Sequence, residues 1–234
     1  MAMTRRRETD GAAQAERGPF DKLGSVADAI SRIQPGATVM IGGYLNVGVP
    51  EKLLTELVRV RIDQLTVIAA DAGTPGRGIG RLISAGLVRR LIAGNVAGNP
   101  EALDRTRRGE LLLEAVTPGT LVERIRAAGA GLGGVLTATG LGTPAADAKR
   151  TVETEGRTYL LETPLRADVA LIACFRSDRA GNLIYKGSAR NFNPAMATAA
   201  DFVVAEAREV YEIGDLDPDR ILTPGVYVHM VVED

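Results

Sequence analysis

Apolar residues recur along this chain in two patterns, as short continuous runs and as stripes at helical spacing. Short apolar runs bounded by turn residues are typical of strands buried on both faces of a sheet. The strands expected in the first half are Ala37–Ile41, Leu65–Ala70, Val88–Ala93 and Leu111–Val116. The helices expected between and after them are Val26–Ile33, a helix opened by Pro50, Ile79–Leu87, Pro100–Arg108 and Leu121–Ala128. This alternation of strand and helix predicts a mostly parallel sheet flanked by helices.

The pattern changes after residue 130, where strands follow one another without long helices between them. Thr151–Thr154 and Arg157–Leu161 are joined by Glu155-Gly156, a pair typical of a hairpin turn. Further strands are expected at Val169–Phe175, Leu183–Tyr185, Phe202–Ala205 and Val226–Val232, and a helix after Asn193-Pro194. The sequence therefore predicts a disordered tail at residues 1–20 and a single α/β domain at residues 21–234, with a β-rich second half.

Composition narrows the class of protein. Hydrophobic residues make up 45% of the chain, charged residues 24%, and the net charge is −1. These values are typical of a soluble globular protein, and the near-zero charge argues against binding to nucleic acid. No apolar run reaches the roughly 18 residues of a membrane span, and residues 1–20 lack the apolar core of a signal peptide. We therefore expect a cytoplasmic protein that binds neither nucleic acid nor membrane.

The chain has one cysteine and one histidine, which limits its metal and nucleophile chemistry. Cys174 lies in the apolar run 170–175, so we interpret it as a buried structural thiol and not as a nucleophile. His229 alone cannot build a His-rich metal site. Paired carboxylates at catalytic spacing and a Gly-x-Ser-x-Gly elbow are both absent from the sequence. We expect neither a metal site nor a permanently bound cofactor.

One glycine-rich segment joins an expected buried strand to an expected helix. Its residues are Gly42, Gly43, Tyr44, Leu45, Asn46, Val47 and Gly48. Glycine lets the backbone come close to a ligand, and the helix that Pro50 opens offers unpaired N–H groups suited to a phosphate or an oxyanion. The alternative is a tight strand-to-helix turn without a ligand. The spacing fits neither a Walker loop nor a dinucleotide-binding Gly-x-Gly-x-x-Gly motif.

Two later segments also carry candidate binding residues. The stretch Gly129–Gly142 has six glycines in fourteen residues, too many for a helix or a packed strand. In Ser188–Pro194, Arg190 could hold a carboxylate or a phosphate, and Asn191 offers both donors and acceptors. We expect Asn193 to be the N-cap of the helix that follows it.

Taken in order, these segments resemble the α subunits of family I CoA-transferases, a family that includes the 3-oxoacid, acetate and butyrate–acetoacetate CoA-transferases. The run Gly42-Gly43-aromatic-x3-Gly48-x-Pro50 is similar to the family's signature. Further blocks similar to the family follow in the same order, namely Gly129–Thr143, Arg166–Ile172, Gly181–Tyr185, Ser188–Pro194, Gly214–Pro218 and Thr223–Val228. The resemblance covers nearly the whole chain after the tail.

The resemblance implies half of an enzyme of short-chain fatty acid metabolism. Such enzymes move CoA between a short-chain acyl-CoA or 3-oxoacyl-CoA and a small carboxylic acid, through a glutamyl-CoA thioester. The glutamate belongs to a β subunit, in a Ser-Glu-Asn-Gly motif that this chain lacks, so no catalytic residue is assigned here. The implied partner is that β subunit in an α2β2 assembly, without which this chain would be inactive.

Coenzyme A enters this picture as a substrate. The resemblance implies that Gly42–Gly48 is the CoA-binding segment. It also implies a substrate pocket or subunit junction at Gly131, Leu132, Gly133, Gly134 and Asn191.

The chain departs from the family's pattern at several positions. Thr117-Pro118-Gly119-Thr120 lacks the glutamine of the family's Pro-Gln-Gly-Thr turn, Tyr44 replaces a usual Phe, and Val135 and Ala138 replace Phe and Pro. We therefore expect these departures to affect the choice of substrate more than the reaction class. An alternative is a non-catalytic regulator on the same fold that binds CoA esters or sugar phosphates. A nicotinamide-dependent oxidoreductase would rest on the glycine loops alone, and the spacing after Ile41 argues against it.

Overall fold

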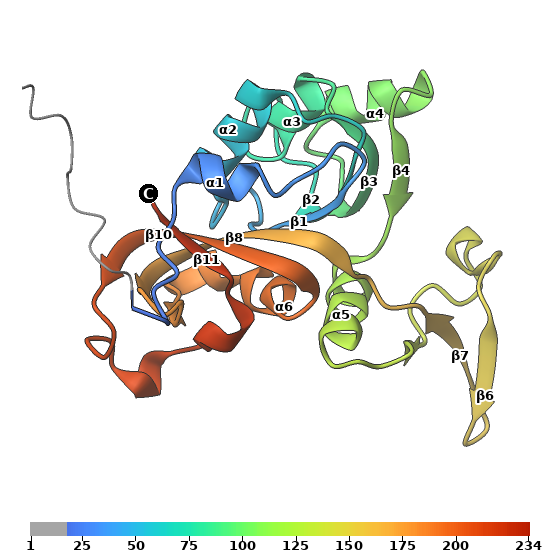
Figure 1. Cartoon of the computed structure of the whole chain (residues 1–234). Helices are drawn as coiled ribbons and strands as arrows, with labels where there is room; N and C mark the ends of the chain where they lie inside the picture. The colour runs from blue at the N-terminus through green and yellow to red at the C-terminus, as the bar shows by residue number, and fades with distance from the viewer. Residues whose placement is uncertain (1–17) are drawn as a thin grey trace, which may run out of the picture.

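The computed structural model describes residues 18–234, and its centre is one eight-stranded sheet (Figure 1). The strands of this sheet are β1 (Thr38–Ile41), β2 (Leu65–Asp71), β3 (Val88–Asn95), β4 (Leu112–Ala115), β8 (Ala167–Asp178), β9 (Leu183–Ile184), β10 (Ala200–Tyr211) and β11 (Met230–Glu233). Their order is β11-β10-β8-β1-β2-β3-β4, all parallel, with β9 pairing antiparallel to β8. The predicted fold class, a mostly parallel sheet flanked by helices in one α/β domain, is confirmed.

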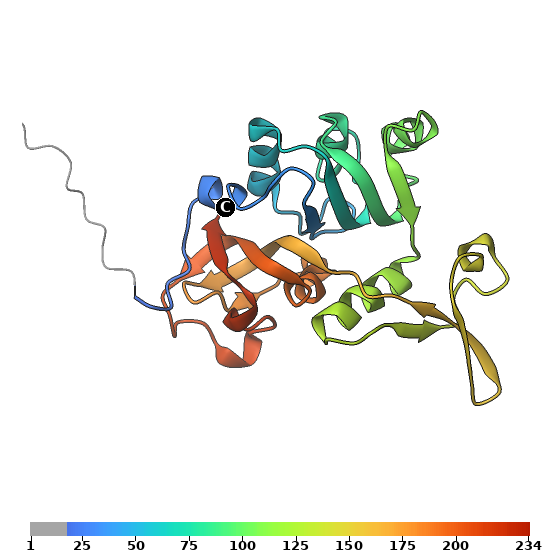
Figure 2. The ribbon, with the colours of Figure 1, turned by 45° about the vertical axis from the view of Figure 1, so that its right-hand side comes forward.

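Helices cover both faces of the sheet (Figures 1 and 2). One face carries α1 (Val26–Ile30), α2 (Glu51–Val60), α3 (Gly80–Ser84) and α4 (Pro100–Arg107), and the other carries α5 (Pro118–Gly129) and α6 (Asn193–Ala197). Alternate residues of a strand point to opposite faces, so Val39 and Ile41 join one core and Met40 joins the other. Burial on both faces explains why the strands read as continuous apolar runs.

The direction of strand addition reverses beside β1. From β1 the chain adds β2, β3 and β4 on one side, and it later adds β8, β10 and β11 on the other. In open α/β sheets, ligands bind outside the carboxyl ends of the strands at such a reversal. Residues 42–48 follow the carboxyl end of β1 at this reversal, so we expect a ligand site at the carboxyl ends of these strands.

A second, smaller sheet extends away from the main body (Figures 1 and 2). It consists of β5 (Val135–Thr137), β7 (Arg157–Glu162) and β6 (Thr151–Thr154), paired antiparallel in that order. The predicted hairpin at Glu155-Gly156 is confirmed, with φ values of 51° and 69° at the two turn residues. The expectation that Gly129–Gly142 holds no packed strand is wrong, because β5 lies inside it and pairs with β7.

Some strand boundaries in the structure differ from the predicted ones. The strand expected at Val226–Val232 begins only at Met230, because Gly225–Tyr227 forms a 3-10 turn, η4, packed against the loop between β8 and β9. A Cβ at Gly225 would lie 2.3 Å from the Ala180 carbonyl oxygen. Strands β8 and β10 are longer than predicted, since charged residues such as the Arg176–Glu209 pair (2.8 Å) continue them past the apolar run. The remaining 3-10 turns are η1 (Pro144–Ala146), η2 (Gly187–Arg190) and η3 (Pro218–Arg220).

The predicted tail at residues 1–20 lies, up to residue 17, outside the described residues. The described part begins at the surface, where the side chain of Phe20 is 68% exposed. Leu23 then pairs with Val231 of β11, which brings the start of the described chain to the edge strand of the main sheet. Among residues 18–234, no helix is both long and apolar enough to cross a bilayer.

Candidate functional site

The glycine-rich segment after β1 folds into a tight turn. The Tyr44 N–H donates to the Val47 carbonyl (3.0 Å), and the Val47 N–H donates to the Tyr44 carbonyl (2.9 Å). Leu45 and Asn46 lie between them with φ values of 48° and 65°, in the left-handed region. The side chains of Tyr44, Leu45 and Val47 are 36%, 59% and 44% exposed. The segment therefore presents apolar side chains to solvent from a backbone that is unfavourable for Leu45.

The glycines of this segment are required by a neighbouring part of the chain. A Cβ at Gly42 would lie 1.7 Å from Asn193 Oδ1, and a Cβ at Gly48 would lie 2.4 Å from the Ala189 carbonyl oxygen. Gly43 and Gly48 also have positive φ values, 110° and 71°. Part of the glycine pattern is thus explained by close packing against residues 188–193, and not only by the approach of a ligand.

Two asparagines hold the segment from that side. Asn191 Oδ1 accepts the Gly43 N–H (3.2 Å), and its Nδ2 donates to the Val47 carbonyl (3.0 Å). Asn193 Oδ1 accepts the Ala173 N–H (3.0 Å), and its Nδ2 donates to the Gly48 carbonyl (3.0 Å). The prediction that Asn193 caps α6 is wrong. It is the first residue of that helix, and its side chain links β8 to the segment after β1.

The N-terminus of α2 is already occupied. Both carboxylate oxygens of Glu206, a buried residue of β10, accept backbone N–H groups, those of Lys52 (3.2 Å) and Leu53 (2.9 Å). Burial raises the pKa of Glu206, and the two backbone hydrogen bonds act against that rise. The expectation of free N–H groups for an anion here is therefore wrong. Pro50 is the N-cap residue and not the first residue of the helix.

A cavity of about 290 Å³ opens beside Gly48 at the point where strand order reverses. Phe175 of β8 and Glu206 of β10 form part of its wall, and Lys186 and Arg208 bring positive charge to it. Within residues 18–234, neither of these cations forms an ion pair. Lys186 Nζ lies 4.7 Å from the centre of the Phe175 ring. Two carboxylates, Glu206 and Asp234, line the same cavity, so its cations and carboxylates are equal in number, and Lys186 and Arg208 are the groups there that could hold an anion.

The start of the second glycine segment lies at the amino ends of the strands, opposite residues 42–48. A Cβ at Gly129, where α5 ends, would lie 2.1 Å from Thr198 Oγ1. Thr198 stands just before the amino end of β10. Gly131, Gly133 and Leu132, which is 55% exposed, follow directly and are open to solvent. The structure therefore does not bring residues 131–134 together with residues 42–48 in one chain, and their role at a subunit junction stays a prediction.

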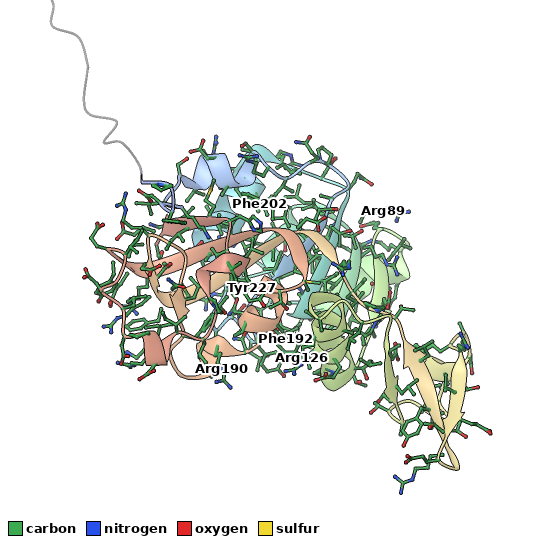
Figure 3. The ribbon with its side chains drawn as sticks, turned by 60° about the horizontal axis from the view of Figure 1, so that its bottom comes forward. Arg89, Arg126, Arg190, Phe192, Phe202 and Tyr227 are labelled. Carbon is green, nitrogen blue, oxygen red and sulfur yellow. The ribbon has the colours of Figure 1, made fainter. Side chains whose placement is uncertain are left out.

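Arg190, another predicted anion ligand, is exposed at the end of η2. Figure 3 shows it on the same face as Phe192, Tyr227 and the α5 residue Arg126. A shallow hollow of about 350 Å³ on this face is lined by Arg126 and Tyr227 but not by Arg190. Arg190 does not line the cavity beside Gly48 either, although its neighbour Ala189 does, and its role as an anion ligand stays a prediction.

The buried carboxylates of the described part are all engaged by hydrogen-bond donors. Glu206 binds the start of α2, Glu162 accepts from Lys149, and Asp178 accepts the Asn182 N–H (2.9 Å). Asp71 accepts two backbone N–H groups at the end of β2. None of these carboxylates is free to act as a nucleophile without losing a structural contact.

Cys174 and His229 are the only cysteine and the only histidine of the chain. Cys174 is a half-buried residue of β8 that lines the cavity beside Gly48, and burial raises the pKa of its thiol, which disfavours the thiolate that a nucleophile requires. Burial also lowers the pKa of His229, whose Nδ1 accepts the Val203 N–H (3.1 Å). Among residues 18–234, no group of three or more His, Cys, Asp or Glu side chains is arranged to hold a metal ion.

Comparison with known sequences identifies close relatives. The alpha subunit of acetate CoA-transferase from Escherichia coli K12 is 46% identical over 212 residues, which cover 90% of this chain and 96% of the relative. The acetoacetyl-CoA:acetate/butyrate CoA transferase alpha subunit of Clostridium acetobutylicum is 47% identical over 204 residues, which cover 87% of this chain and 94% of the relative.

Comparison with solved structures shows the same fold. An acyl-CoA transferase from Escherichia coli O157:H7 matches with a TM-score of 0.83 and 21% identity over 93% of this chain, which spans 48% of that longer chain. Glutaconate coenzyme A-transferase from Acidaminococcus fermentans matches with a TM-score of 0.81 and 19% identity, over 91% of this chain and 75% of the other. The coenzyme A transferase family model matches residues 24–234. The chain belongs to the coenzyme A transferase family.

Proposed function

We propose that this chain is the α subunit of an enzyme that moves CoA between a short-chain acyl-CoA or 3-oxoacyl-CoA and a small carboxylate. The observation that carries the proposal is the identity of 46% and 47% to two curated α subunits over nearly their whole length. Relatives of this kind are named as transferase subunits, so the alternative of a non-catalytic regulator is not favoured.

The nucleophile belongs to the partner in this proposal. A β subunit supplies the glutamate whose carboxylate receives CoA as a thioester, in an α2β2 assembly located in the cytoplasm. Two observations support this division of labour. The chain has no Ser-Glu-Asn-Gly motif, and its buried carboxylates already accept structural hydrogen bonds.

The segment Gly42–Gly48 and the cavity beside it form this chain's part of the CoA site. The exposed side chains of Leu45 and Val47 suit the aliphatic arm of CoA, since they are apolar groups that a ligand can cover. Lys186 and Arg208, which share the cavity with the carboxylates of Glu206 and Asp234, are the groups that would hold an anionic part of either substrate. Residues 131–134, at the opposite edge, would face a partner subunit.

Substrate choice is expected to depend on a second cavity at the carboxyl edge of the sheet. This cavity, of about 670 Å³, lies between the start of α5 and β5. Thr117, in the turn that lacks the family's glutamine, and Val135, where the family has Phe, both line it. Two segments that depart from the family's pattern therefore meet at one place. We expect this enzyme to accept a range of acyl groups different from that of the relatives compared above.

The test is to purify this chain by itself and together with its β subunit, and to follow the loss of acetoacetyl-CoA with acetate as acceptor. We expect no transferase activity from the chain by itself and full activity from the complex. A panel of carboxylic acids of increasing chain length would then rank the acceptors. Full activity of the isolated chain would contradict the proposed division of labour.

A further inference from the structure

Asp71, the last residue of β2, joins two loops that follow neighbouring strands. Its side chain is buried, with 5% of the residue exposed. Oδ2 accepts the Leu45 N–H (2.6 Å), in the turn that follows β1. Oδ1 accepts the Gly73 N–H (2.6 Å), in the loop that follows β2 itself. Each oxygen therefore holds a backbone group of a different loop.

The N–H group that Asp71 Oδ2 accepts belongs to Leu45, the residue of this turn with the least favourable backbone conformation. Leu45 has a φ of 48°, a conformation that a residue with a Cβ adopts only when its surroundings hold it there. A hydrogen bond from a backbone N–H to a carboxylate is charge-assisted and stronger than one to a neutral acceptor. Asp71 thus offsets the backbone strain at the place where the strain occurs.

A second turn supports the first from the same side. After β2, the Arg77 N–H donates to the Thr74 carbonyl (3.0 Å), which repeats the arrangement seen at Tyr44–Val47. Asn46 Nδ2 reaches across and donates to Thr74 Oγ1 (3.3 Å). A Cβ at Gly78 would lie 2.8 Å from Asn46 Oδ1, so the two turns are in close contact.

We infer that Asp71 is a positioning residue for the CoA-transferase reaction. It holds the Leu45–Asn46 turn in the conformation that presents Tyr44, Leu45 and Val47 at the carboxyl edge, and it touches no substrate itself. The inference rests on the proposed function, because it assigns the presented side chains to the CoA site.

Asparagine cannot replace Asp71 in this role. Both side-chain oxygens of Asp71 accept N–H groups, and an amide has only one oxygen. In D71N the amide nitrogen would face either the Leu45 N–H or the Gly73 N–H, donor against donor. The substitution keeps the size of the side chain and removes one of the two contacts.

The experiment compares D71N with D168N in the complex with the β subunit. Asp168 is the control: its Oδ2 accepts one backbone N–H, that of Thr38 (2.7 Å), from an exposed position at the amino end of β1. Hydrogen exchange of the peptide covering residues 42–49 and steady-state kinetics are measured on both variants. We expect D71N to speed exchange and to lower kcat/KM, each by about tenfold or more, and D168N to stay within about twofold of wild type in both.

A second variant covers the case in which D71N does not fold. T74V removes the acceptor of Asn46 Nδ2 and leaves the carboxylate in place, and we expect a change of about threefold in the same direction in both measurements. Unchanged exchange at residues 42–49, or faster exchange with unchanged kcat/KM, would overturn the inference. A wild-type complex without transferase activity would overturn the proposed function instead. The hold of Asp71 on the turn would then be decided by the exchange rates alone.

Discussion

Gly42 lies where two segments distant in sequence meet most closely. Its missing side chain makes room for Asn193, whose amide binds the Ala173 N–H and the Gly48 carbonyl. Asn193 is fully buried and held by several hydrogen bonds, so it cannot move aside for a larger neighbour. The lack of a side chain at Gly42 therefore allows Asn193 to link β8 to the segment after β1.

We expect G42A to lower the free energy of unfolding by about 2 kcal/mol or more, because the new methyl group would overlap Asn193 Oδ1. Urea unfolding measures this change. G119A is the matched control, since a Cβ at Gly119 meets open space in the first turn of α5. Alanine there should be neutral or stabilise by up to about 1 kcal/mol. Equal stability of G42A and wild type would show that Asn193 can give way.

At the scale of elements, β10 supplies the cap of α2. Most helix N-termini are capped by a residue next to them in sequence. Here the carboxylate of Glu206 reaches the N–H groups of Lys52 and Leu53 from a strand two places away in the sheet. The cap fixes the point at which the segment after β1 becomes a helix, and it brings a buried charge to the wall of the cavity.

The burial of Glu206 makes part of the stability depend on pH. Burial, together with the charges of Asp234 and Glu51, raises the pKa of Glu206 in the folded chain above its value of about 4.3 in the unfolded chain. Its contribution is therefore complete below that unfolded value and is lost as pH rises through the folded pKa. We expect the unfolding free energy of wild type minus that of E206Q to fall as pH rises above the unfolded pKa value of Glu206. Guanidinium unfolding of both proteins at a series of pH values measures it, and a difference that grows with pH would contradict the assignment.

At the scale of the whole molecule, the main sheet and the small sheet differ in how they are held. The two cores on the faces of the main sheet share its strands, because neighbouring residues such as Val39 and Met40 point into different cores. These cores must therefore unfold together. The small sheet joins the body through β5, which packs on α5, and through the Arg124–Glu162 ion pair (3.8 Å). Its edge strand β6 is mostly exposed.

We expect the backbone amides of β6 to exchange at least about tenfold faster than those of β1 and β8, through local opening of the hairpin. Hydrogen exchange followed by mass spectrometry distinguishes these peptides. The buried strands serve as the internal control, since they should exchange only by global unfolding. Equal exchange in β6 and β1 would mean that the small sheet is part of the same cooperative unit.

Most of the fold could be predicted from the sequence, and the failures have physical causes. Strands such as β1 and β2 were predicted to within about one residue, because burial on both faces leaves a local apolar run. The outer part of β8 was missed because its residues are charged and are stabilised by partners on β10. Strand β5 was missed because it has only three residues, lies among glycines, and is stabilised by its pairing with the distant strand β7.

The alternating α/β architecture, the hairpin of the small sheet and the segment Gly42–Gly48 as a candidate ligand-binding segment could all be inferred from the sequence. The surroundings of that segment follow from the tertiary structure. Glu206 rather than a ligand caps α2, Asn193 requires Gly42, and Asp71 holds Leu45. Apolar periodicity and turn residues act within a few positions along the chain, so they can be read locally. A buried polar contact depends on which distant strand becomes the neighbour, and that is decided only when the sheet assembles.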